Sequence, residues 1–194
     1  MGIVTTQHSS SIDGFIADRH GRSDSLHDWL RAGGQKSRVN PNFAMHPLNA
    51  RFFDDGVGRC GAVIAGRRTY NVSDGWGGAG PMGHRPLFVV TSRAPYEVPS
   101  ANPPYTFVTD GITAAVDVAK KAAGGLDVVL MGASMVQQCL RAGLLDELII
   151  SIVPVLLGSG VRLLDSRDLD GIALEVVSVI DAPGVTHLTY RVRR

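Results

Sequence analysis

Three short segments of the sequence place hydroxyl groups after apolar runs, and the first two of them also carry guanidinium groups. They are Gly66-Arg67-Arg68-Thr69-Tyr70, Thr91-Ser92-Arg93 and Met131-Gly132-Ala133-Ser134. Free backbone N–H groups at the start of a helix attract phosphate, and arginine adds bidentate, charge-assisted hydrogen bonds. A solvated pair of arginines at a helix start would explain the first segment taken alone. The three segments together favour a groove that holds a phosphorylated cofactor.

The hydrophobic pattern indicates the elements that would position these segments. Apolar and β-branched runs bounded by glycine and proline predict eight strands. These are Ile3–Ser9, Ala62–Ala65, Leu87–Thr91, Tyr105–Val108, Val128–Met131, Leu148–Val155, Ala173–Ile180 and Thr186–Val192. Ligands of open α/β sheets bind at the carboxyl ends of the strands, which is where the three segments lie.

Helical spacing of apolar residues predicts three helices, at Pro47–Asp55, Ile112–Ala123 and Ser134–Ala142. Strands that alternate with helices, followed by a closing run of strands, predict an α/β fold. Its sheet is expected to be mixed and mainly parallel, covered on both faces, with antiparallel C-terminal strands at one edge.

Details of these elements can also be predicted. Ser134 is expected to cap the amino end of its helix. In the first helix, Leu48, Phe52 and Phe53 are expected to face inward. The polar stretch from residue 33 to 46 is expected to be a long loop, and such loops often carry function.

Two stretches fit the Gly-x-Gly-x-x-Gly pattern of dinucleotide-binding turns, but neither has the right context. Gly56–Gly61 precedes an apolar run, and Gly75–Gly80 leads into Pro81 and another strand. The pattern binds pyrophosphate only after a strand and at the start of a helix. The six histidines lack the spacing of metal ligands. We therefore expect neither a Rossmann domain nor a metal site.

Length and composition limit the remaining classes. The 194 residues suit one domain over residues 1–194, and a formal net charge of +1 gives no broad footprint for nucleic acid or an anionic membrane. Cys60 and Cys139 are too few for a disulfide framework, and no run of about 18 apolar residues occurs. We expect a cytoplasmic protein that acts on a small molecule, without nucleic-acid or membrane partners.

Several motifs, in this order along the chain, resemble those of one family. They are Ser11–Ala17, Gly66–Tyr70, Val89–Arg93, Met131–Met135 and the two runs Gly143–Leu148 and Pro154–Gly160. The sequence resembles the dihydrofolate reductase-like proteins and, more narrowly, the reductase domain of riboflavin biosynthesis that forms the C-terminal half of RibD. The resemblance spans nearly the whole chain. It implies a three-layer α/β/α dihydrofolate reductase-like fold and a homodimer built on the late strands.

The resemblance also implies an NADPH site. The strand ends would hold the adenosine 2′-phosphate and the pyrophosphate, through Gly66, Arg67, Arg68, Thr69, Thr91, Ser92 and Arg93. The turn before the last helix would pack on the pyrophosphate, through Gly132, Ala133, Ser134, Met135 and Val136. The first strand and the loop after it would line the nicotinamide, through Ser9, Ile16 and Ala17. Clustered arginines favour NADPH over NADH, because they suit an additional dianionic phosphate.

Two features depart from the family pattern. Ala133 stands where the second glycine of a pair is usual, and its methyl group could crowd the pyrophosphate. Dihydrofolate reductases carry a carboxylate that faces the pterin on the helix before the Gly-Arg strand. Here the corresponding helix has acids only at its far end, Asp54 and Asp55. The pterin-binding acid is therefore not carried over to this chain.

The sequence indicates less clearly which residues would bind and protonate the substrate. Candidate proton donors are Asp13, Asp28 and Tyr70, each of which is also explained as a turn former, cap or packing residue. Trp29 and Phe43 are candidates to stack on a planar substrate, or they cover an edge of the core. His27, beside Asp28, is the one histidine of interest.

These observations leave three functions open. The first is an NADPH-dependent reductase of a small heterocyclic or carbonyl substrate, resembling a pterin or a ribosylaminopyrimidine. The second is the riboflavin-pathway 5-amino-6-ribosylaminouracil phosphate reductase itself, for which Arg38 and Arg51 could bind the substrate phosphate. The third is a module that binds NADPH or a ligand without turnover.

Overall fold

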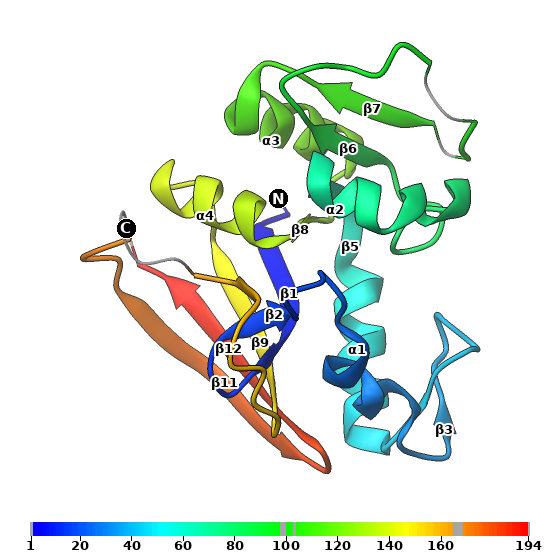
Figure 1. The fold of residues 1–194 in the computed structure, drawn as a ribbon, viewed down its shortest axis with the longest axis vertical. Helices are drawn as coiled ribbons and strands as arrows, with labels where there is room; N and C mark the ends of the chain where they lie inside the picture. Colours follow the sequence, from blue (N-terminus) through cyan, green and yellow to red (C-terminus); the bar gives the residue numbers. More distant parts are fainter. Residues whose placement is uncertain (1, 98–99, 103, 165–168, 194) are drawn as a thin grey trace.

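An eight-stranded sheet organises the computed structural model, which describes residues 2–97, 100–102, 104–164 and 169–193. Its strand order is β11-β12-β9-β1-β8-β5-β6-β7 (Figure 1). The strands are β1 (Val4–Ser11), β5 (Cys60–Gly66), β6 (Leu87–Val90), β7 (Tyr105–Val108), β8 (Asp127–Met131), β9 (Glu147–Val153), β11 (Leu174–Ala182) and β12 (Val185–Val192). The six strands from β9 to β7 pair in parallel, and the C-terminal hairpin β11–β12 adds to β9 in antiparallel register. The predicted sheet is confirmed, with strand ends that shift by one or two residues.

Helices cover the two faces of this sheet. One face carries α3 (Gly111–Ala122) and α4 (Ala133–Arg141), and the other carries α1 (Pro47–Arg59) and the short α2 (Arg67–Val72). Alternation along β5 divides the core, because Ile64 packs with α3 and α4 while Val63 packs with Tyr70 of α2. The result is the expected three-layer α/β/α arrangement (Figure 1).

The three predicted helices are confirmed, but two details were wrong. Leu48 lies in the first turn of α1 and is 47% exposed, whereas Phe52 and Phe53 are half-buried as expected. Ser134 does not cap α4: the residue before that helix is Gly132, and the Ser134 hydroxyl accepts a hydrogen bond from Gln138 one turn later. No helix in the described part of the chain is long and apolar enough to span a membrane.

Several short strands and 3-10 helices lie outside the eight-stranded sheet. β2 (Phe15–Ala17) pairs with β10 (Val161–Arg162), and the 3-10 helices are η1 (Asp24–Leu26), η2 (Asp28–Arg31) and η3 (Asp74–Gly78). The predicted loop 33–46 contains a small hairpin, β3 (Gln35–Lys36) and β4 (Ala44–Met45).

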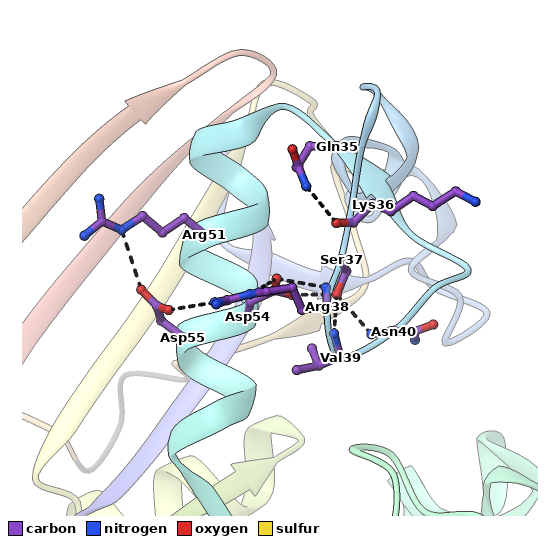
Figure 2. Close-up of polar contacts among 9 residues, drawn as sticks. All are labelled: Gln35, Lys36, Ser37, Arg38, Val39, Asn40, Arg51, Asp54 and Asp55. Carbon is purple, nitrogen blue, oxygen red and sulfur yellow. Dashed lines mark hydrogen bonds and ion pairs between the residues drawn. The ribbon is translucent and has the colours of Figure 1, made fainter.

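A buried carboxylate of α1 anchors this hairpin segment. Asp54 accepts hydrogen bonds from the Ser37 hydroxyl at 2.5 Å and from the Arg38 backbone N–H and Nε at 2.9 and 3.1 Å. Figure 2 shows how these side chains lie. Although burial opposes it, these hydrogen bonds hold the pKa of Asp54 below its usual value. The ionised, hydrogen-bonded carboxylate of Asp54 therefore ties this segment to α1.

Candidate functional site

A large cavity lies at the carboxyl edge of the parallel strands. It has a volume of about 1020 Å³ and opens where β5, β6 and β8 end and α2 and α4 begin. Its walls include ten of the predicted cofactor residues, namely Gly66, Arg67, Arg68, Thr69, Thr91, Ser92, Gly132, Ala133, Ser134 and Met135. Because β5 pairs with both β6 and β8 in parallel, their ends meet at one edge. We call this cavity the arginine groove.

The arginines of this groove differ in how freely they can bind an anion. Arg67 donates from Nε to Asn71 at 3.0 Å, and its guanidinium lies 5.6–5.8 Å from the ring centres of Phe107 and Tyr70. Arg68 is exposed and forms no ion pair within the described residues. Arg68 is therefore available to pair with a phosphate of a bound ligand.

Two arginines of the groove were missed by the sequence analysis. Arg19 follows β2 and Arg162 lies on β10, and both line the groove. The Arg162 guanidinium lies 4.4 Å from the centre of the Phe15 ring and donates to the Asp13 carbonyl at 3.1 Å. No local sequence pattern placed Arg19 and Arg162 in the groove. Both reach it only because β2 pairs with β10, and these two segments are far apart in the sequence.

Of the residues predicted to lie at the cofactor phosphates, Val136 and Arg93 are outside the groove. Val136 is fully buried in the core beneath α4, so its side chain cannot contact a ligand. Arg93 is exposed but is not part of the wall. The Thr91 hydroxyl donates to the Arg93 carbonyl at 2.9 Å and folds the chain back at this point.

A histidine fixes the turn that enters α4. Gly132 has φ = +90°, and a Cβ there would lie 2.2 Å from the Thr69 hydroxyl oxygen, so only glycine fits. The Gly132 N–H donates to His8 Nε2 at 3.0 Å, and His8 Nδ1 lies 2.6 Å from the Thr6 hydroxyl oxygen, which itself donates to Leu130. Since Nε2 accepts, the His8 proton sits on Nδ1 and the ring is neutral. Burial, with a smaller contribution from His27, lowers the pKa of His8 to about 4.

Two further cavities continue the arginine groove. A middle cavity of about 510 Å³ shares Arg68, Thr69 and Gly132 with the groove, and its wall includes the predicted nicotinamide residues Ser9, Ile16 and Ala17. The second, of about 690 Å³, shares a wall with the middle cavity through Gln7, Ser9, Asp24, His27, Trp76 and Met131. The three cavities therefore adjoin one another along the sheet edge, and we refer to them together as the channel.

Aromatic side chains contribute to the wall of the cavity at the far end of this channel. Trp29 and Phe43 line it as predicted, together with Phe53 and Trp76, which were not predicted. Trp29 is only 4% exposed and donates from Nε1 to the Ser9 hydroxyl at 3.1 Å, so it presents no more than an edge. We call this the aromatic cavity.

The structure brings none of the three predicted proton donors to the channel. Asp13 accepts backbone hydrogen bonds from Leu157 and Gly158 at 3.1 and 2.7 Å, and the Ser11 side chain together with these N–H groups lowers its pKa to about 2. It braces a loop in its ionised form. Asp28 is exposed on η2, and no wall of the three cavities contains it.

Tyr70 is a packing residue. Its ring makes edge contacts with Tyr105 and Phe107 at 5.9 and 5.4 Å between centres, and burial raises its pKa. Asp24 and His27, which were not predicted as proton donors, line both the aromatic and the middle cavity. Burial lowers the pKa of His27.

Helix α1 presents apolar side chains to the aromatic cavity where dihydrofolate reductases are expected to present an acid. Phe53 and Val57 line the cavity, while Asp54 is turned to Ser37 and Arg38. Asp55 pairs with Arg38 at 3.4 Å and with Arg51 at 3.8 Å (Figure 2). Arg38 and Arg51 are thus engaged outside the aromatic cavity, which leaves them without support as ligands of a substrate phosphate.

Fold and channel together define an α/β protein of the dihydrofolate reductase-like class. The model of the RibD C-terminal domain family matches residues 3–188, so the chain belongs to that family. The resemblance seen in the sequence is therefore confirmed.

Solved structures agree with this assignment at the level of the fold. A protein from Shewanella sp. PV-4, described as a riboflavin biosynthesis protein, superposes with a TM-score of 0.75 at 23% identity, covering 100% of both chains. RibD of Acinetobacter baumannii gives 0.66 at 18% identity, and this chain spans 58% of it. Dihydrofolate reductase from Enterococcus faecalis, in complex with NADP(H), gives 0.64 at 13% identity over 100% of this chain and 98% of that one. A search of curated proteins finds no significant match to the sequence.

Proposed function

We propose that the protein is an NADPH-dependent reductase of a small, planar heterocyclic or carbonyl compound. The observation that supports this proposal is the channel of three adjoining cavities, from the arginine groove through the middle cavity to the aromatic cavity. Such a channel accommodates a charged cofactor at one end and an apolar, planar substrate at the other, with both reacting groups meeting in the middle cavity. Membership of the RibD C-terminal domain family supports the same class of reaction.

The residues present fit NADPH. Arg67 and Arg68 would hold the phosphates, and Gly132 lines the same groove in a turn where a Cβ would lie 2.2 Å from the Thr69 hydroxyl oxygen. Ser9 and Ala17 would border the nicotinamide in the middle cavity. When bound, the cofactor supplies a hydride, and positioning the two reactants side by side accounts for much of the rate enhancement.

The protein would also have to deliver a proton. Asp24 and His27 stand where the middle and aromatic cavities join, within one turn of each other on the chain. General acid catalysis requires a group within hydrogen-bond reach of the reacting atom. We propose these two residues as the first candidates, in place of Asp13, Asp28 and Tyr70.

The riboflavin-pathway reductase remains the second candidate, and Arg31 favours it. Arg31 lines the aromatic cavity, lies 5.6 Å from the centre of the Phe43 ring, and has no acidic partner among the described residues. A phosphate on the substrate would supply one. Arg85 also lines the cavity, but its three donor nitrogens are used by backbone carbonyls.

Titration with NADPH separates these proposals from a protein without a cofactor. We expect quenching or enhancement of NADPH fluorescence and a raised melting temperature at millimolar NADPH, because a ligand that binds only the folded state stabilises it. No change in either signal would refute the cofactor assignment. If NADPH binds but no pterin, quinone, flavin or aminopyrimidine is reduced, a binding module becomes the better account.

We also propose a homodimer through the C-terminal hairpin. β11 is an edge strand with four exposed apolar side chains, Leu174, Val176, Val177 and Val179, each 40–60% exposed. A second copy that covers this strand would bury them. Light scattering of the purified protein tests it: a mass of two chains supports the proposal, and a mass of one chain refutes it.

A further inference from the structure

A row of polar side chains crosses three strands behind the aromatic cavity. His187 on β12 is the register partner of Ser151 on β9, and Ser151 is the register partner of Ser9 on β1. Register partners point to the same face of a sheet, on strands about 4.8 Å apart. Ser9 and Ser151 both line the aromatic cavity, whereas His187 lies fully buried behind them.

Hydrogen bonds fix the state of the histidine. Asn49 of α1, which is also fully buried, donates from Nδ2 to the Pro183 carbonyl at 3.3 Å, and this leaves its Oδ1 facing His187 Nε2 at 3.2 Å. Because Oδ1 can only accept, Nε2 must carry the proton. Burial lowers the pKa of His187 to about 4, so the ring is neutral near pH 7 and Nδ1 is an acceptor.

The neutral ring in turn determines the direction of the Ser151 hydroxyl. Ser151 Oγ lies 2.8 Å from His187 Nδ1, and a bond at that position requires the hydroxyl hydrogen to point to the histidine. Phe52 stacks on the imidazole at 3.8 Å between ring centres, and Trp29 meets it edge-on at 5.1 Å, so the ring cannot turn away. Only lone pairs of Ser151 Oγ remain for the cavity.

The Ser9 hydroxyl has the opposite hydrogen-bonding role to that of Ser151. Its oxygen already accepts the Trp29 indole N–H, and its own hydrogen has no acceptor within the described residues. Ser9 can therefore donate to a ligand, while its neighbour Ser151 can only accept. Adjacent donor and acceptor groups match the edge of a ring in which an amino or N–H group stands next to a ring nitrogen or carbonyl.

We propose that His187 is a positioning residue which holds the Ser151 hydroxyl as a hydrogen-bond acceptor for an amino or ring N–H group of a planar nitrogen heterocycle bound in the aromatic cavity. This inference deepens the proposed function and rests on it for the identification of the aromatic cavity as the substrate site. Asn49 acts through His187, and Ser9 supplies the complementary donor.

A pair of ligands of equal size tests the polarity of Ser151 directly. The probes are 4-aminoquinazoline and 4-methylquinazoline, which differ by one donor group, titrated by fluorescence into the full chain with and without saturating NADPH. We expect wild-type protein to bind the amino compound about 10-fold more tightly, the factor that one net hydrogen bond supplies. Ser151→Ala is expected to bring this ratio close to 1. Ser10→Ala is the matched control, because Ser10 is a buried serine of β1 that donates to Ser11 and lies outside the three cavities.

His187→Phe distinguishes positioning from packing. Phenylalanine keeps the ring but releases the Ser151 hydrogen, so we expect the preference for the amino compound to fall at least 3-fold. Equal weakening of both probes would show a merely structural histidine and overturn the proposal. Nitrogen NMR of wild-type His187 needs no variant: protonation at Nε2 is expected, and protonation at Nδ1 would overturn it.

The remaining outcomes separate this inference from the reductase proposal. If neither quinazoline binds the wild-type protein, or if both bind equally, the polarity assigned to Ser151 is wrong. NADPH binding measured in the same samples would still support the reductase. If NADPH fails to bind but the amino compound is preferred, the inference on His187 stands and the cofactor assignment falls.

Discussion

The two ends of the channel are built in different ways. The arginine groove is formed by turns at the ends of β5, β6 and β8, so its position follows from the order of parallel strands. The aromatic cavity is assembled from β1, β9, α1 and the loops around η2 and η3, whose side chains meet only through tertiary packing. Sheet topology therefore determines where the cofactor would bind, whereas loops and helix faces determine what would be reduced.

The largest effect is expected at the turn of the arginine groove. Gly132→Ala places a methyl group 2.2 Å from the Thr69 hydroxyl in a backbone conformation with φ = +90°. Relief of this clash must move the turn, so we expect NADPH affinity to fall by about 100-fold, or about 2.7 kcal/mol. Gly143→Ala is the matched control, since it has φ = +64° with nothing within 4 Å. Similar NADPH affinity in both variants would show that the turn does not shape the site.

The second effect is a dependence of stability on pH that involves both ends of the channel. Burial lowers the pKa of His8 and of His187 from 6.5 to about 4, so the unfolded chain binds more protons between these values. Stability is therefore complete above pH 6.5 and is lost as the pH falls toward 4. For the fully buried His187 we expect a loss of about 2 kcal/mol between pH 7 and pH 5, and a smaller loss for His8, which is partly accessible.

Urea unfolding at several pH values measures this dependence. His187→Phe is expected to flatten the profile more than His8→Gln, and His84→Gln, at an exposed histidine, is the control. A profile that stays equally steep in His187→Phe would contradict the neutral, buried state assigned to that ring.

A third prediction compares two arginines, one within the arginine groove and one outside it. Arg67→Ala is expected to weaken NADPH by about 10-fold and NADH much less, because it removes a charge from the additional phosphate. Arg93→Ala is expected to have little effect, since Arg93 does not line the groove. Calorimetric titration with both cofactors measures these differences. A greater loss of NADPH affinity in Arg93→Ala than in Arg67→Ala would support the role in phosphate binding that the sequence predicted for Arg93.

The smallest effect is expected at the aromatic cavity. Arg31→Gln should raise KM about 5-fold for a phosphate-bearing aminopyrimidine and leave NADPH affinity unchanged, since an exposed charge contributes a modest, screened interaction. Arg51→Gln provides the control, because Arg51 pairs with Asp55 outside this cavity. Equal KM values for wild type and Arg31→Gln would remove the observation that favours the riboflavin-pathway substrate.

The contrast between the two ends of the channel also explains which features could be predicted from the sequence. Strands and the Gly66–Tyr70 turn could be predicted because β-branched runs, glycine and helix starts are local signals. Trp76 could not be placed in the aromatic cavity, because its position depends on the glycine-rich η3, where it adopts φ = +52°. Ser151 sits in an ordinary strand, and its partner His187 is 36 residues away. Asp13 resembled a catalytic acid in sequence, but only the fold reveals that Leu157 and Gly158 occupy its carboxylate.

A crystal structure of the protein with NADPH would show whether the arginine groove and the middle cavity hold the cofactor. We expect phosphate density against Arg67 and Arg68 and the nicotinamide ring in the middle cavity beside Ser9 and Ala17, with the aromatic cavity left open for substrate. A nicotinamide bound within the aromatic cavity, or adenosine phosphates held away from the Gly66 and Gly132 turns, would contradict this expectation.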